Sequence, residues 1–149
     1  EKYFQAFPAI KGFLDKLGNF GKQYGYIKTF PPYNRKRWFS TWYPRIWDNK
    51  SSMIELGSIE RASKNTPIQG ASADMTKLAL VLMRDYIKMT GIPVKLVMTV
   101  HDQIDTICDN EYLSMWTDKM KELMELAANR IVTNNLLKAE VTVSNCWEK

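Results

Sequence analysis

The sequence is poor in the residues that build metal clusters and disulfide frameworks. Its 149 residues include only two cysteines, Cys108 and Cys146, and a single histidine, His101. No CxxC pair occurs, which argues against a zinc site made of His and Cys and leaves a disulfide framework unsupported. These absences predict a reducing, cytoplasmic setting.

Long apolar runs are also missing. No run reaches the roughly 18 residues that a membrane span needs. The segment from Glu1 to Phe7 lacks the basic-then-apolar order of a signal peptide. We therefore expect no membrane partner. The chain opens without Met inside what looks like a helix, which suggests a piece cut from a longer protein.

What is present resembles an ordinary globular domain. The composition is 45% hydrophobic and 25% charged, and the length suits one core. Twenty-one basic against sixteen acidic residues leave a net charge of +5. This modest surplus makes an anionic partner plausible without naming it. The clearest basic cluster is Arg35, Lys36, Arg37 and Arg45.

Apolar spacing predicts three helices in the first 90 residues. The first runs from about Pro8 to Tyr24, where Gly25 is placed to end it. Residues 28–48 are rich in aromatic, basic and proline residues and predict an irregular connection. A short helix should open with a Ser52/Glu55 capping box and stop near Lys64, before Pro67. A third, from Ala71 to Met89, should be buried on most sides.

The second half predicts a hairpin and a long helix. The strands are Lys95–Val100 and Ile104–Cys108, joined by a tight turn at 101–103. An amphipathic helix from Leu113 to Ile131 follows a cap at Asp109 or Asn110, and residues 139–144 alternate like a third strand. The order predicts an α+β fold, with helices packed on a small antiparallel sheet.

Asp102 is the first candidate for chemistry. A carboxylate exposed at a tight turn between two buried strands is rigidly held, and carboxylate oxygens suit Mg²⁺. The alternative is that Asp102 is simply a good turn former, and that His101 is structural.

The segment Arg61 to Gly70 is the second candidate. It sets Arg61, Lys64, Asn65 and Gln69 at the expected junction of two helices. These side chains donate hydrogen bonds of the kind that read grooves and phosphates, although a solvated interhelical turn would have the same composition.

Taken together, these segments resemble the C-terminal part of family A DNA polymerases, the class of bacterial DNA polymerase I. Residues 3–8, YFQAFP, are similar to the family's YFxxFP, and residues 25–29, GYIKT, to its GYVxT turn. Residues 60–74 resemble its ER…NxPxQGTAAD block, residues 100–102 its VHDE motif, and Trp147 its closing tryptophan. The blocks occur in the right order along nearly the whole chain.

The resemblance implies a magnesium-dependent nucleotidyl transfer from a dNTP to a primer 3′-hydroxyl, with two Mg²⁺ ions. Asp102 would be a catalytic metal ligand and His101 would lie beside the primer terminus. Gln69 and Arg61 would probe the minor groove, where acceptors are nearly alike for all base pairs. Asn65 would touch the template side. The implied partners are primer–template DNA and dNTP.

Two positions depart from the family pattern. Gln103 stands where the family has Glu, so its part in metal binding is left open. Residues 31–37, PPYNRKR, replace a glycine-led arginine run. Only a phosphate-contacting role is carried over for Arg35 and Arg37.

The resemblance also implies what lies outside the chain. Residues 1–50 would be the end of the fingers subdomain and 51–149 the C-terminal half of the palm. The other catalytic Asp and the dNTP-binding helix would belong to the N-terminal remainder of the polymerase, so the isolated chain should be inactive. The setting would be a bacterial cell or a virus-infected host. The alternative is a non-catalytic palm-like module that binds DNA or a partner polypeptide; an HD-type phosphohydrolase is disfavoured because it needs several histidines.

Overall fold

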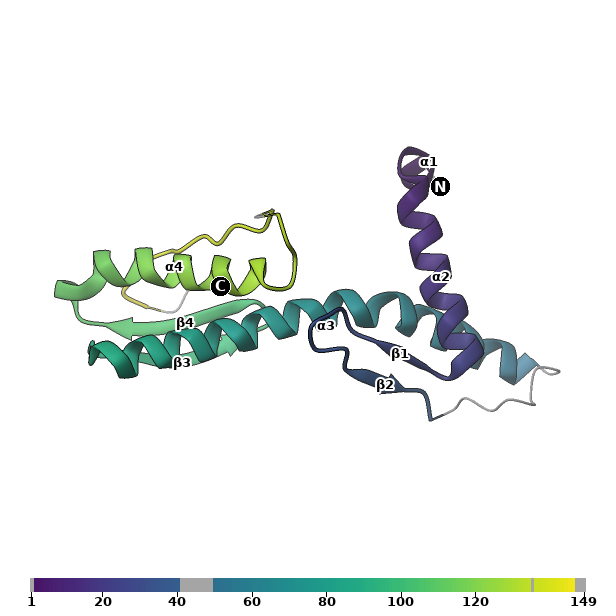
Figure 1. Ribbon diagram of the computed structural model, residues 1–149, viewed down its shortest axis with the longest axis horizontal. Helices are drawn as coiled ribbons and strands as arrows, with labels where there is room; N and C mark the ends of the chain where they lie inside the picture. Colours follow the sequence, from purple (N-terminus) through teal and green to yellow (C-terminus); the bar gives the residue numbers. More distant parts are fainter. Residues whose placement is uncertain (1, 41–49, 135, 147–149) are drawn as a thin grey trace. The chain divides into compact units, whose positions relative to one another are not determined.

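The computed structural model describes residues 2–40, 50–134 and 136–146 (Figure 1). These form two compact units, Glu1–Ala71 and Ser72–Lys149, which are described in turn. The predictions made for Arg45 and Trp147, and for the capping side chain of Ser52, lie outside the described residues. Over the described part of the chain, no helix is both long and apolar enough to cross a membrane.

The first unit begins with two helices, α1 (Lys2–Ala6) and α2 (Pro8–Tyr24). The predicted bounds of α2 are confirmed. Pro8 stands in the first turn, where a missing N–H breaks no helical hydrogen bond. Gly25 adopts the left-handed conformation at φ 72°, and its N–H donates to the carbonyl of Gly21 at 2.9 Å. A residue with a Cβ would be strained at that position, so Gly25 ends the helix.

A short ribbon follows α2. Strand β1 (Tyr26–Lys28) pairs antiparallel with β2 (Lys36–Trp38), with Tyr26 opposite Trp38. The expectation of an irregular connection over residues 28–48 was therefore wrong for Lys28 and for residues 36–38. Pro31 and Pro32 lie in the turn and do not interrupt the ladder. Two hydrogen bonds between Thr29 and Arg35 extend the pairing, one of 2.9 Å between backbones and one of 3.0 Å to the Thr29 hydroxyl.

Helix α3 (Lys50–Thr90) runs unbroken for 41 residues and contains Pro67 in its interior. The prediction of two helices separated at Pro67 was wrong. An interior proline disfavours a helix by about 3 kcal/mol, through a lost hydrogen bond and a clash with the preceding turn. Here Pro67 is fully buried with Ser63 one turn before it. The burial of Pro67 and Ser63 stabilises the helix and opposes the local tendency of proline to end it.

Helices α2 and α3 pack closely together within the first unit. A Cβ placed on Gly21 would overlap the Ser63 side chain, and one on Gly18 would lie 2.8 Å from Cγ of Glu60. Both glycines are buried. The two helices therefore pack where the side chains of α2 are absent.

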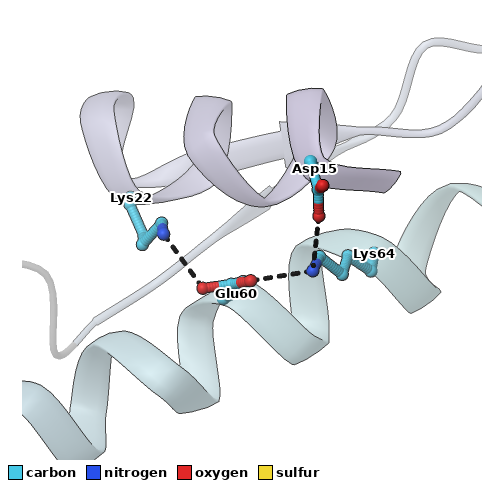
Figure 2. A network of polar contacts seen from close by, with 4 residues as sticks. All are labelled: Asp15, Lys22, Glu60 and Lys64. Carbon is cyan, nitrogen blue, oxygen red and sulfur yellow. Dashed lines mark hydrogen bonds and ion pairs between the residues drawn. The ribbon is translucent and has the colours of Figure 1, made fainter. Parts of the chain in front are cut away.

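A polar network lies along the same contact (Figure 2). Glu60 accepts from Lys22 at 2.9 Å and from Lys64 at 2.7 Å, and Lys64 also donates to Asp15 at 3.2 Å. The hydrogen bonds from Lys64 and then Lys22 lower the pKa of Glu60 to about 2. The hydrogen bond to Glu60 likewise raises the pKa of Lys64. All four side chains are partly exposed, so solvent weakens the attraction.

The second unit is built on the predicted hairpin. Strand β3 (Val94–Val100) pairs antiparallel with β4 (Gln103–Cys108), with a bulge between Leu96 and Met98. A 3₁₀ turn (Asn110–Tyr112) leads into α4 (Leu113–Asn129), which runs alongside the hairpin (Figure 1). The hairpin and the amphipathic helix are both confirmed. Asp109 precedes the turn without a side-chain cap.

A hydrophobic core joins α3, the hairpin and α4 in this unit. Trp116 is 1% exposed, and its indole N–H donates to the hydroxyl of Thr106 at 2.8 Å. Met83 of α3 is fully buried. The buried members are Ala79, Met83, Ile92, Val94, Ile104, Trp116, Met120, Leu123 and Ala127. The fold is α+β, as predicted.

Two details of the second unit differ from expectation. Residues 139–144 form no strand in the described chain: the Ala139 N–H donates to Glu125 at 3.3 Å, so this segment is attached to α4. Alternation alone does not make a strand, because a strand needs a neighbouring strand to pair with, and residues 139–144 show no such pairing. Helix α3 is also less buried than expected, since Val81 and Met89 are 41% and 78% exposed.

Candidate active site and nucleic-acid interface

The β3–β4 turn holds the predicted catalytic pair. His101 and Asp102 are the turn residues, and the neighbouring pair Val100 and Gln103 closes the ladder. His101 adopts the left-handed conformation at φ 56°, an uncommon conformation for a residue with a side chain. Both side chains are exposed. The Asp102 carboxylate is thus held at a tight turn and open to solvent, which fits a hard cation with oxygen ligands.

Gln103 faces a second carboxylate on the same strand. Its amide nitrogen donates to one oxygen of Asp105 at 2.7 Å. The other Asp105 oxygen is buried and has no hydrogen-bond partner in the described chain. The two side chains share a face because they are two residues apart in a strand. Asp105 was missed by the sequence reasoning, although this period-two spacing was a signal for it.

The face of the hairpin that carries Asp105 is not covered within its unit. Ile104 points to the core and is 5% exposed, whereas Ile107 on the opposite side is 61% exposed. Val97 and Met98 of β3 are also exposed, at 57% and 41%. The two strands, which were expected to be buried, are therefore buried on one face only, because the unit's helices contribute to the core on that face.

Within the first unit, α3 aligns the predicted groove-reading residues. Arg61, Asn65 and Gln69 are exposed and follow one another at intervals of four residues. Side chains spaced this way lie on one helical face, and eight residues span about 12 Å at 1.5 Å each. This alignment exists because α3 passes through Pro67 without a break. The predicted helix junction would not have produced it.

Strand alternation directs the basic side chains of Lys36 and Arg37 to opposite sides of the ribbon. Arg37 donates to the hydroxyl of Thr66 on α3 at 3.0 Å, so its side chain points inward. Arg35 lies over the Tyr33 ring at 5.2 Å. Lys36 points to the other side of the ribbon, 5.3 Å from the Trp38 ring centroid. Arg35 and Arg37 were predicted to contact phosphates, and Lys36, which belongs to the same basic cluster of the sequence, lies on the opposite side of the ribbon from Arg37.

No group of three or more His, Cys, Asp or Glu side chains placed to hold a metal occurs among the described residues. Asp102 lies in the second unit, and the stripe of Arg61, Asn65 and Gln69 lies in the first. What these positions offer is one accessible carboxylate, one row of hydrogen-bond donors and one basic ribbon.

Comparison with known proteins places the whole chain in one family. The model of DNA polymerase family A matches residues 1–149. DNA polymerase I of Caldicellulosiruptor bescii is 36% identical over 104 residues, which are 69% of this chain and 11% of that protein. DNA polymerase I of Bacillus caldotenax is 28% identical over 147 residues, 99% of this chain and 16% of that protein. The chain therefore spans a small part of the relatives that it matches.

A solved structure agrees with the sequence matches. The POL domain of Pol1 from M. smegmatis, in complex with DNA primer-template and dNTP, superposes with a TM-score of 0.71 at 26% identity. The match covers 85% of this chain and 21% of that one. A family match along the full length, together with this structural likeness, establishes that the chain belongs to the family A DNA polymerases.

Proposed function

We propose that this chain is the C-terminal part of a DNA polymerase that transfers a nucleotide from a dNTP to a primer 3′-hydroxyl on a DNA template. The observation that carries the proposal is Asp102, an exposed carboxylate at the β3–β4 turn of a chain that matches the polymerase family throughout. Residues 1–50 would form the C-terminal part of the fingers subdomain, and residues 51–149 would form the C-terminal half of the palm.

Asp102 would be a ligand of Mg²⁺, because its carboxylate is accessible and held by a short turn. When bound, the metal would supply positive charge at the oxygens that attack and leave phosphorus. The second catalytic carboxylate would come from the N-terminal remainder of the polymerase. His101, next to Asp102 on the same turn, would position the primer terminus.

The exposed residues Arg61, Asn65 and Gln69 on α3 would contact the DNA. Gln69 and Arg61 would donate hydrogen bonds to minor-groove acceptors of the newly formed pair, and Asn65 would contact the template strand. Because these acceptors sit in similar places for every correct pair, such contacts test pair geometry and not sequence. The regular four-residue spacing supports this role, since it presents successive donors along one line.

Arg35 would contact the DNA backbone. Arg37 keeps further N–H groups after its hydrogen bond to Thr66, so it could contact a phosphate while it joins the ribbon to α3. These contacts would be independent of sequence and sensitive to salt, as phosphate contacts are.

The decisive experiment is Asp102→Ala in the full-length polymerase, with Asp109→Ala as the matched control. Asp109 is an exposed carboxylate at the far end of the same hairpin. We expect Asp102→Ala to abolish primer extension without changing the melting temperature, and Asp109→Ala to extend normally. Extension by Asp102→Ala within a few-fold of the parent would refute the assignment. That result would favour a non-catalytic DNA-binding module, for which Gln103 in place of Glu is the supporting observation.

A further inference from the structure

The β1–β2 ribbon has an inner and an outer face. Ile27 is 3% exposed and its cross-strand partner Arg37 reaches Thr66, so these two residues define the inner face toward α3. Alternation places two other cross-strand pairs, Tyr26 with Trp38 and Lys28 with Lys36, on the opposite side. We call these four residues the outer ribbon face.

Two aromatic rings on the outer ribbon face form a supported surface. The centroids of Tyr26 and Trp38 are 4.9 Å apart at an interplanar angle of 47°. Phe20 of α2 meets Tyr26 edge-on, with centroids 5.4 Å apart, and anchors the pair to the helix. Trp38 is nevertheless 65% exposed. A large, fixed aromatic side chain that remains mostly in water has apolar area available for a ligand.

Positive charge surrounds this aromatic surface. The Lys36 ammonium lies 5.1 Å from the Tyr26 centroid and 5.3 Å from the Trp38 centroid. Lys28, its cross-strand partner, is exposed. No acidic residue occurs in the chain between Asp15 and Asp48, so the sequence of the ribbon itself holds no opposing charge.

We propose that the outer ribbon face binds single-stranded DNA, with Trp38 stacking on an unpaired base and Lys28 and Lys36 contacting the flanking phosphates. Exposed aromatic rings beside a basic surface are the usual means of holding single strands without sequence preference. Duplex DNA would not use Trp38, because its base faces are already stacked on one another. The inference rests on the proposed polymerase function in one respect, which is that the template strand ahead of the primer supplies the unpaired bases.

The test compares two DNA probes on the full-length polymerase. One probe is a primer–template with an unpaired 5′ thymine overhang, and the other is a blunt duplex with the same paired sequence. Fluorescence anisotropy would measure the affinity of each for the parent, Trp38→Ala and Trp38→Phe. Phe13→Ala is the control, because Phe13 is an exposed aromatic residue of the same unit outside the ribbon.

We expect Trp38→Ala to weaken overhang binding about 5- to 150-fold, as loss of one stacked base implies, and to leave blunt-duplex binding unchanged. Trp38→Phe should keep most of the affinity because it keeps a ring. Equal losses on both probes, an unchanged overhang affinity, or a Trp38→Phe defect as large as that of Trp38→Ala would overturn the proposal. Hydrogen exchange of residues 26–38 would show directly whether any variant disrupts the ribbon.

The lysines provide a second, independent readout. A Lys28→Ala/Lys36→Ala variant should reduce the log–log salt slope of overhang binding by about 1.4, which is about 0.7 for each single-strand phosphate that is no longer neutralised. An unchanged salt slope would show that Lys28 and Lys36 do not contact the phosphates. All of these outcomes are separate from the Asp102 experiment, since binding to the overhang is measured without extension.

Discussion

Each of the two units of this chain is stabilised internally by a different kind of interaction. The second unit buries a continuous apolar core in which Trp116 and Met83 are almost inaccessible. The first relies on close backbone approach at Gly21 and on partly exposed ion pairs around Glu60. Core burial is strong and insensitive to pH, whereas an exposed ion pair is weak and titrates. Substitutions in the two units should therefore differ in size and in their response to pH.

The largest expected effect is at Trp116. Trp116→Ala should destabilise the second unit by about 3–5 kcal/mol, because it leaves a large cavity and removes the hydrogen bond to Thr106. Native-state hydrogen exchange in the full-length polymerase would measure the opening free energy of α4. Trp116→Phe, which keeps a ring but loses the N–H, should cost less. Similar losses for both variants would mean that the hydrogen bond and not the packing dominates.

The second effect is at the close contact of the first unit. Gly21→Ala should destabilise the α2–α3 contact by about 1–3 kcal/mol, because the new methyl group overlaps Ser63. Gly12→Ala is the matched control, since a Cβ there meets nothing within 4 Å. The control should instead stabilise α2 by about 0.5–1 kcal/mol through helix propensity. Hydrogen exchange of the α2 amides would measure the opening free energy of α2 in both variants. Equal changes in this free energy would contradict the close contact at Gly21.

The smallest effect is at the ion-pair network. Glu60→Gln should cost less than about 1 kcal/mol, because the carboxylate is 34% exposed and solvent screens it. The pKa of Glu60 is lowered on folding from 4.5 to about 2, so its contribution is fully present above pH 4.5 and is lost as the pH falls toward 2.

The measurement for Glu60 is the difference in α2 opening free energy between the parent and Glu60→Gln as a function of pH. This difference should shrink as the pH falls through the same window. Titration of other carboxylates is common to both proteins and cancels in the difference. A constant difference would show that Glu60 acts by packing and not by charge.

Much of the candidate site could be anticipated from residue patterns. The hairpin that exposes Asp102 follows from two β-branched runs separated by turn residues, and the structure confirms it. The alignment of Arg61, Asn65 and Gln69 could not be anticipated, because Pro67 locally predicts a helix end. Asp105 was missed for a related reason: its hydrogen bond to Gln103 depends on both side chains lying on one strand face. The roles of all these residues stay predictions until tested.

The sequence by itself determined the local elements whose signals agree: α2 between Pro8 and Gly25, the β3–β4 hairpin and the amphipathic helix α4. In each, apolar period, cap and turn chemistry point to the same structure. Tertiary structure decided the elements whose local signals conflict or are weak. It carried α3 through Pro67, paired β1 with β2 and left residues 139–144 without a strand partner. The physical reason is that burial and pairing with distant segments contribute free energies as large as the local preferences, and no local pattern contains them.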